Sequence, residues 1–166
     1  FIIIAMIVLF SDGFPIFFRQ KRIGINNNEF QIYKFRTMKN STPDVATDQL
    51  KNPNDYLISC GFFLRKYSLD ELPQIINVIN GTLNFIGPRP ALHNQEDLII
   101  LRTKKKIHSI LPGITGWAQV NGRDNLDIFE KVRMDYYYLI KKSFLLDLKI
   151  IFLTIYKVIN SENIKY

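Results

Sequence analysis

The chain has 166 residues and a formal net charge of +7 at pH 7, and 47% of its residues are hydrophobic. This length suffices for one domain with a hydrophobic core, and the apolar content excludes an intrinsically disordered chain. The single cysteine, Cys60, excludes an internal disulfide and a cysteine-based metal site, and we expect it to be a small buried apolar residue. The positive charge favours anionic partners such as nucleic acid, phosphorylated small molecules or an anionic membrane surface.

The first segment, residues 1–10, is apolar and holds no charged side chain. As a helix it would span ~15 Å, about half of the hydrocarbon core of a bilayer. It has neither the basic region nor the small-residue cleavage site of a signal peptide. We interpret it as part of a membrane-inserted segment, and the alternative is a buried helix or strand of the core.

Two strands are predicted next, over residues 16–24 and 30–38. The second strand shows the two-residue alternation of a strand, and the asparagines at 26–28 are a turn signal. We therefore expect the two strands to pair as a hairpin. Its basic and aromatic side chains suit either a nucleic acid or a nucleotide. The polar residues 39–55 predict a loop.

Two helices are predicted after this loop, over residues 56–67 and 72–79. The first is expected to turn four apolar side chains inward: Leu57, Phe62, Phe63 and Leu64. Gly81 suits a left-handed cap at the end of the second helix. The apolar residues 83–87 then predict a short strand.

The C-terminal half is predicted to be mainly helical. Residues 94–110 carry acids followed by bases, which is typical of a solvated helical face; the alternative is contact with anionic lipid headgroups. A helix is predicted over residues 129–141. The last helix, residues 144–159, has a broad apolar face and a narrow charged one, so we interpret it as lying in the plane of a membrane surface. The alternative is an ordinary amphipathic helix of the core.

Two adjacent acids, Asp70 and Glu71, stand where a helix is expected to begin. Ser68 and Glu71 have the spacing of a capping box, and Pro73 suits a first helical turn. Helix capping would explain one acid at this place. It does not explain two acids beside several cationic residues and the rigid segment 88–90, Pro-Arg-Pro.

Two neighbouring carboxylates can divide the tasks of phosphoryl transfer. One can bind Mg²⁺, which prefers oxygen ligands, and an ionised aspartate can attack phosphorus without a general base. Arg89 offers a planar fork that matches phosphate, and Pro88 and Pro90 restrict the chain on both sides of it. The pattern therefore predicts chemistry on a phosphate held by a divalent cation.

Five blocks of the sequence, in this order, resemble the bacterial sugar transferase family, the monotopic phosphoglycosyl transferases. They are FFRQKRIG (17–24), YKFRTM (33–38), SLDELPQ (68–74), GPRP (87–90) and PGITGWAQVNGR (112–123). The resemblance covers nearly the whole chain. It implies transfer of a sugar 1-phosphate from a UDP-sugar to a polyprenyl phosphate such as undecaprenyl phosphate, with Mg²⁺ as cofactor and UMP as product.

The resemblance also implies roles for individual residues. Asp70 would be the nucleophile and would carry a covalent phosphosugar intermediate. Glu71, together with Asp70, would hold the metal, and Arg89 would bind phosphate or nucleotide. Weaker candidates for the same anionic site are Lys34, Arg36 and Arg65.

The implied fold is a small single domain of the α/β (α+β) class, with short strands and amphipathic interfacial helices. Residues 1–10 would be the remnant of a re-entrant membrane helix, and residues 11–166 would form the catalytic domain. The implied location is the cytoplasmic face of the bacterial inner membrane, at the first step of O-antigen, capsule or glycan assembly. Expected partners are a UDP-sugar, the polyprenyl phosphate and membrane lipids, with no nucleic acid; the oligomeric state stays open.

The resemblance also implies that residues 123–128, Arg-Asp-Asn-Leu-Asp-Ile, lie in a region that varies with the sugar, and this region hints at an N-acetylated hexosamine. Two rival interpretations remain. One is a basic module that binds a membrane or nucleic acid without catalysis, and the other is a chain in which Asp70 and Glu71 only cap a helix. Neither rival explains why an acid pair and a Pro-Arg-Pro segment occur together.

Overall fold

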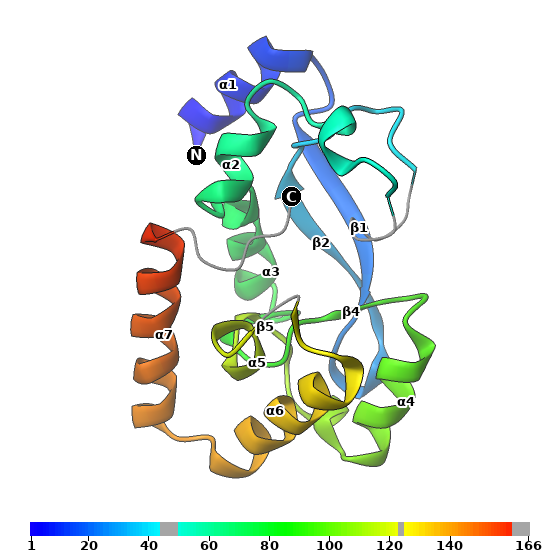
Figure 1. Cartoon of the computed structure of the whole chain (residues 1–166), viewed down its shortest axis with the longest axis vertical. Coiled ribbons are helices and arrows are strands. Elements are labelled where there is room, and N and C mark those ends of the chain that lie inside the picture. The colour runs from blue at the N-terminus through cyan, green and yellow to red at the C-terminus, as the bar shows by residue number, and fades with distance from the viewer. Residues whose placement is uncertain (44–49, 123–124, 161–166) are drawn as a thin grey trace.

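Two small β-sheets organise the computed structural model, which describes residues 1–43, 50–122 and 125–160 (Figure 1). In the first sheet β1 (Phe17–Ile23) lies between β2 (Glu29–Phe35) and the short β4 (Ala91–Leu92), and both pairings are antiparallel. In the second sheet β3 (Asn84–Ile86) runs parallel to β5 (Gly113–Thr115).

The predicted hairpin of β1 and β2 is confirmed, with Phe17 opposite Phe35 and Ile23 opposite Glu29. The strands are joined through the 3₁₀ turn η1 (Ile25–Asn27). Asn26 and Asn27 have left-handed backbone conformations, with φ of 53° and 60°. Asparagine enters this region more readily than most residues, so the asparagine run determines how the hairpin turns.

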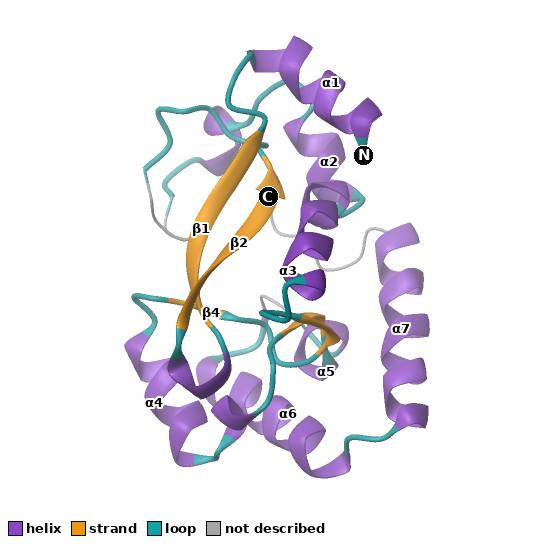
Figure 2. Cartoon of the chain, turned by 180° about the vertical axis from the view of Figure 1, so that it is seen from behind, coloured by secondary structure: helices purple, strands orange, loops and turns teal. Residues whose placement is uncertain are grey.

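Helices surround the two sheets. They are α1 (Ile2–Asp12), α2 (Gly61–Lys66), α3 (Ile75–Ile79), α4 (Glu96–Lys104), α5 (Trp117–Val120), α6 (Ile128–Lys141) and α7 (Phe144–Ile159), with the 3₁₀ turns η3 (Pro53–Tyr56), η4 (Leu69–Gln74) and η5 (Ile107–Ser109). Figure 2 shows α1, α2 and α3 following one another beside the hairpin, with α7 on the outer side of α3. The mixed α and β composition confirms the predicted fold class in its general form.

Three clusters of buried apolar side chains hold these elements together. They are Val8, Phe35, Ile58 and Leu64; Ile86, Val120, Tyr138 and Ile150; and Ala91, Leu98, Ile107 and Val132. The first cluster fixes α1 and α2 on β2, and the other two fix α6 against α7 and α4. Burial of such side chains contributes ~1.5–3 kcal/mol each. The first and third clusters therefore hold the three-stranded sheet, and the second holds the sheet of β3 and β5.

The C-terminal helices lie where the sequence predicts them, since α7 has the predicted bounds and α6 begins one residue earlier. The helix predicted over 56–67 is confined to Gly61–Lys66. Leu64 is buried there, but Phe62 and Phe63 are about half exposed, at 49% and 54%, so their predicted inward orientation is wrong. In this short helix only the face that carries Gly61 and Leu64 is buried.

The predicted capping box at the acid pair is also wrong. Ser68 has a left-handed backbone with φ of 54°, and its side chain makes no capping hydrogen bond to η4. Asp70 and Glu71 nevertheless stand in the first turn of a helical segment, as predicted. Because Pro73 lies within η4 and has no N–H to donate, the chain stays in a 3₁₀ turn and the α-helix α3 begins only at Ile75.

Large apolar side chains are exposed on the first and last helices. The most exposed are Ile2, Ile3 and Phe10 on α1 and Phe144, Leu145, Phe152 and Ile159 on α7. In the described part of the chain, no helix combines the length and the apolar character that crossing a bilayer requires. The re-entrant helix over residues 1–10 and the interfacial role of α7 stay predictions. Cys60 is half-buried rather than fully buried.

Candidate active site

The acid pair is attached to the hairpin through one buried side chain of α3. Asn77, which is 2% exposed, accepts a hydrogen bond at Oδ1 from the backbone N–H of Tyr33 and donates from Nδ2 to the carbonyl of Gln31, at 3.1 and 2.7 Å. These two bonds occupy the edge of β2 as a neighbouring strand would. They fix η4 and its acids beside Lys34, the residue that follows Tyr33 on β2.

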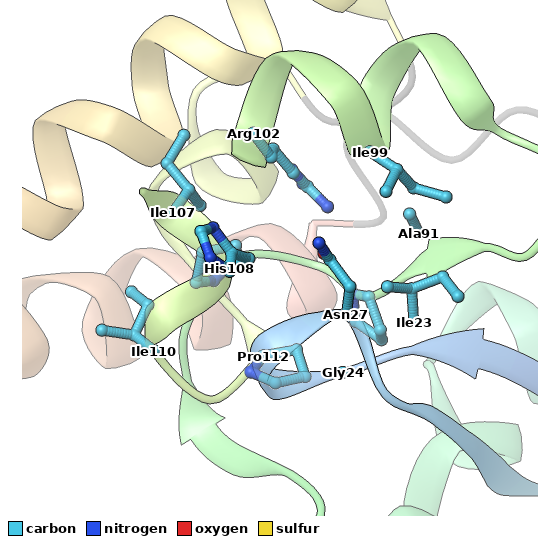
Figure 3. Close-up of a pocket in the computed structure, with 12 residues that line it drawn as sticks. Ile23, Gly24, Asn27, Ala91, Ile99, Arg102, Ile107, His108, Ile110 and Pro112 are labelled. Atoms are coloured by element: carbon cyan, nitrogen blue, oxygen red, sulfur yellow. The ribbon is translucent and has the colours of Figure 1, made fainter. Parts of the chain in front are cut away.

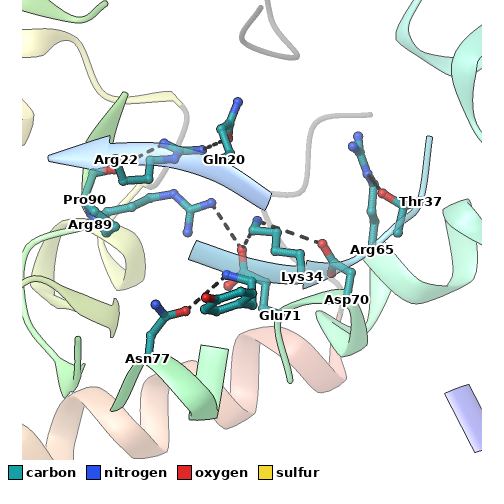
Figure 4. Close-up of polar contacts among 11 residues, drawn as sticks. Gln20, Arg22, Lys34, Thr37, Arg65, Asp70, Glu71, Asn77, Arg89 and Pro90 are labelled. Atoms are coloured by element: carbon teal, nitrogen blue, oxygen red, sulfur yellow. Dashed lines mark hydrogen bonds and ion pairs between the residues drawn. The ribbon is translucent and has the colours of Figure 1, made fainter. Parts of the chain in front are cut away.

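We define the acid–cation cluster as Lys34, Asp70, Glu71 and Arg89 (Figure 4). Glu71 Oε1 lies 2.7 Å from Lys34 Nζ and 3.2 Å from Arg89 Nη2. Lys34 Nζ is also 4.0 Å from Asp70 Oδ2. Three segments far apart in the sequence thus bring two carboxylates and two cations together, as the sequence predicts.

Burial changes the proton affinity of these groups. Burial raises the pKa of Asp70; the charge of Glu71 raises it further, while Lys34, Arg65 and Arg89 oppose the shift. Burial also lowers the pKa of Lys34, against the opposing charges of Glu71 and Asp70. Groups whose pKa is shifted by burial and by specific charged partners concentrate at functional sites.

Arg65 lies at the border of the cluster. Its Nε donates to Thr37 Oγ1 at 2.9 Å, and burial lowers the pKa of its guanidinium, while the charges of Asp70 and Glu71 raise it. Arg65 therefore acts on the acid pair through its charge. Figure 4 shows it on the Asp70 side of the cluster, with Arg89 on the Glu71 side.

Arg36, also predicted to bind phosphate, is not brought into this cluster. Its side chain is buried and forms an ion pair with the carboxylate of Asp12. It also donates to the carbonyls of Pro15, Asp12 and Gly13, at 2.6, 2.9 and 2.7 Å. In this structure Arg36 joins β2 to the segment that leaves α1, and the partners of its guanidinium are Asp12, Gly13 and Pro15.

The structure adds three supporting residues that the sequence did not predict: Asn77, Arg102 and Asp135. Asn77 had a visible signal, because it is the one polar residue in the apolar run Ile75–Ile79. Arg102 lies in the charged run predicted to be solvated; Lys104 to Lys106 are exposed, but Arg102 turns inward. Arg102 Nη2 lies 2.6 Å from Oδ2 of Asp135. Asp135 is on another helix, so no local sequence pattern reveals this pair.

The acid pair could hold a magnesium ion only together with a substrate. Among the described residues no group of three or more histidine, cysteine or acidic side chains could hold a metal ion. Mg²⁺ commonly takes one or two carboxylates and completes its shell with phosphate oxygens and water. Asp70 and Glu71 would supply the two carboxylates, so the diphosphate of a substrate and water would have to provide the other ligands.

Comparisons with known proteins agree with this chemistry. The family model for bacterial sugar transferases matches residues 1–161. The uncharacterized sugar transferase EpsL of Bacillus subtilis is 42% identical over 164 residues, which are 96% of this chain and 77% of that protein. The UDP-glucose:undecaprenyl-phosphate glucose-1-phosphate transferase of Escherichia coli is 40% identical over 161 residues, 93% of this chain.

A galactosyl transferase, CpsE of Streptococcus agalactiae, is 36% identical over 157 residues, 87% of this chain. This chain spans 35% of the length of that protein and also 35% of the Escherichia coli transferase.

Proposed function

We propose that this chain, which belongs to the bacterial sugar transferase family, transfers a hexose 1-phosphate from a UDP-sugar to undecaprenyl phosphate. The observation that carries this proposal is the acid–cation cluster, in which a buried carboxylate pair is surrounded by Lys34, Arg89 and the charge of Arg65. Such an arrangement suits an anionic substrate whose reacting phosphorus needs an ionised oxygen beside it.

In the first step a carboxylate oxygen of Asp70 attacks the phosphorus that bears the sugar. An oxygen–phosphorus bond forms to Asp70, and the bond between that phosphorus and the bridging oxygen breaks. UMP leaves with the bridging oxygen, and the sugar 1-phosphate stays on Asp70. No proton has to be removed from the nucleophile, so the step needs no general base.

In the second step an oxygen of undecaprenyl phosphate attacks the same phosphorus. The bond to Asp70 breaks, the carboxylate is regenerated, and a lipid-linked diphosphate sugar is released. Arg89 and Arg65, on either side of the acid pair, are placed to bind the phosphate oxygens as their charge changes. Lys34 lowers the pKa of Asp70 and so favours its ionised form.

Asp70 and Glu71 would hold Mg²⁺ together with the diphosphate. When bound, the ion neutralises the charge that develops on the leaving phosphate. Glu71 also receives the hydrogen bonds of Lys34 and Arg89. It therefore has a second task, which is to keep both cations directed at the substrate.

The lipid acceptor requires the site to lie near a membrane, and we place the chain on the cytoplasmic face of the bacterial inner membrane. The support is the exposed apolar surface of α1 and α7.

The sugar of the donor is less closely defined. The names of the relatives specify glucose and galactose chemistry, so they give no support to the N-acetylhexosamine predicted from residues 123–128, of which 123 and 124 lie outside the described residues.

The test is UMP release from a panel of UDP-sugars, beginning with UDP-glucose, in detergent with undecaprenyl phosphate and Mg²⁺. We expect UMP release with at least one donor and dependence on the acceptor for multiple turnovers. Absence of UMP release with every donor, combined with binding to anionic vesicles, would instead support a binding module without catalysis.

A further inference from the structure

The segment that carries Arg89 is held by its three consecutive carbonyl groups. Pro88 and Pro90 have no N–H to donate, so this segment can be fixed mainly through its oxygen atoms. The Pro88 carbonyl accepts from the N–H of Gly113 at 3.0 Å, and the Arg89 carbonyl accepts from Arg102 Nη1 at 2.8 Å. The Pro90 carbonyl accepts from Arg22 Nη1 at 3.2 Å.

Arg102 is itself held in place by a buried acid. Asp135, which is 1% exposed, accepts at Oδ2 from Arg102 Nε and Nη2, at 3.0 and 2.6 Å. One edge of the guanidinium therefore faces Asp135 on α6, and Nη1 remains for the Arg89 carbonyl. A planar fork with fixed donors can satisfy both partners at once.

The segment is buried at both prolines and borders a small cavity. The cavity has a volume of about 30 Å³ and is lined among others by Pro88, Pro90, Arg102 and His108 (Figure 3). The three hydrogen bonds to its carbonyl groups add to this packing in fixing the position of the segment.

We propose that Arg102, held by Asp135, is a positioning residue that fixes Arg89 for binding of the donor phosphate, and that Arg22 acts in the same way at Pro90. This inference rests on the proposed function of Arg89. Neither arginine has to touch the substrate, because each acts through a backbone carbonyl of the Pro-Arg-Pro segment. Their effect on donor binding should appear only while Arg89 is present.

The test is a double-mutant cycle on UMP release by the full chain, with Arg102→Lys, Arg89→Ala and the double variant. Lysine keeps a charge opposite Asp135 but cannot reach both partners as a fork does. We expect Arg102→Lys to lower kcat/KM about 10-fold in the wild-type background and less than about 2-fold when Arg89 is alanine. Equal losses in both backgrounds would overturn the proposal. Arg22→Lys is expected to show the same dependence with a smaller loss.

Ile58→Val is the control for loss of stability alone, since Ile58 belongs to the α1–β2–α2 cluster. It should lower the melting temperature without coupling to Arg89→Ala. Hydrogen exchange of residues 87–95 supplies a readout that does not depend on catalysis. We expect faster exchange in Arg102→Lys and an unchanged rate in Ile58→Val. If the wild type releases no UMP, the proposed function fails, while unchanged exchange in Arg102→Lys would refute the positioning role separately.

Discussion

Asp70 and Asp135 are both buried carboxylates, yet their surroundings differ. Burial raises the pKa of each. Asp135 accepts two hydrogen bonds from Arg102, at 2.6 and 3.0 Å, whereas the ion-pair distance from Asp70 to Lys34 is 4.0 Å. The cations near Asp70 also have other partners, because Lys34 and Arg89 bond Glu71 and Arg65 bonds Thr37. Asp135 is thus held closely by one arginine, while the cations near Asp70 are shared with other partners.

The largest expected effect separates the two acids by activity. Asp70→Asn should lower UMP release by at least about 10³-fold, because the nucleophile is lost. Its free energy of unfolding at pH 7 should stay unchanged or rise by about 1 kcal/mol. The raised pKa means that ionised Asp70 costs stability as pH rises through that pKa, and asparagine removes this cost. A large loss of stability would remove the contrast with Asp135.

The second expected effect is on stability. Asp135→Asn should lower the free energy of unfolding by about 3 kcal/mol, because Arg102 keeps a buried charge without its carboxylate. Urea denaturation followed by fluorescence of Trp117 measures this difference. Equal denaturation midpoints for Asp135→Asn and the wild type would show that the pair is not structural.

The third effect concerns Glu71, which shares its oxygen with Lys34 and Arg89. Glu71→Gln removes one metal-binding charge, so about 10-fold more Mg²⁺ should be needed for half-maximal UMP release. A Mg²⁺ titration measures it, with Glu29→Gln as the control, since Glu29 pairs with Lys21 at the exposed hairpin end. Superimposable titrations of Glu71→Gln and wild type would exclude Glu71 as a metal ligand.

The fourth effect is on pH dependence. The proposed first step requires ionised Asp70. The rate of UMP release in a single turnover should therefore increase as the pH rises through the raised pKa of Asp70. The charge of Lys34 lowers the pKa of Asp70, so Lys34→Gln should raise that pKa. The acidic side of the pH–rate profile should then move to higher pH. Single-turnover rates measured across the acidic range test this. If the acidic side of the profile stays in place or moves to lower pH, Lys34 does not lower the pKa of Asp70 in the way proposed.

The smallest effect on catalysis is expected at Arg36, whose acid partner is Asp12. Arg36→Lys should change the KM for the UDP-sugar less than about 2-fold and lower the free energy of unfolding by about 1–2 kcal/mol, because its bonds to the segment after α1 are lost. Steady-state kinetics and urea denaturation measure the two quantities. A strong increase in KM with unchanged stability would instead show that Arg36 binds the substrate phosphate.

The sequence predicted the parts of this fold that depend on local patterns. The alternation of β2, the asparagine turn and the apolar face of α7 each follow from residues close together in the chain. The residues that hold the site depend on contacts between distant segments. Arg36 and Arg89 are both arginines within matching motifs, but only the folded chain shows that Arg36 turns to Asp12 and Arg89 to Glu71.

The helix start at the acid pair shows a second limit. Ser68 and Glu71 have the spacing of a capping box, yet the backbone of Ser68 is left-handed and the segment is a 3₁₀ turn. The packing of η4 against β2 and the proline at 73 override that local signal. The pair Arg102 and Asp135 likewise lies 33 positions apart and is brought together only by the packing of α4 on α6.

The most direct measurement is capture of the first step on Asp70. The full chain is incubated with a UDP-sugar that it uses, without lipid acceptor, quenched and digested for mass spectrometry. The proposed mechanism predicts a sugar phosphate on the peptide that contains Asp70, in an amount equal to the UMP released, and its loss when undecaprenyl phosphate is added. UMP release without such an adduct, or an adduct on another residue, would contradict it.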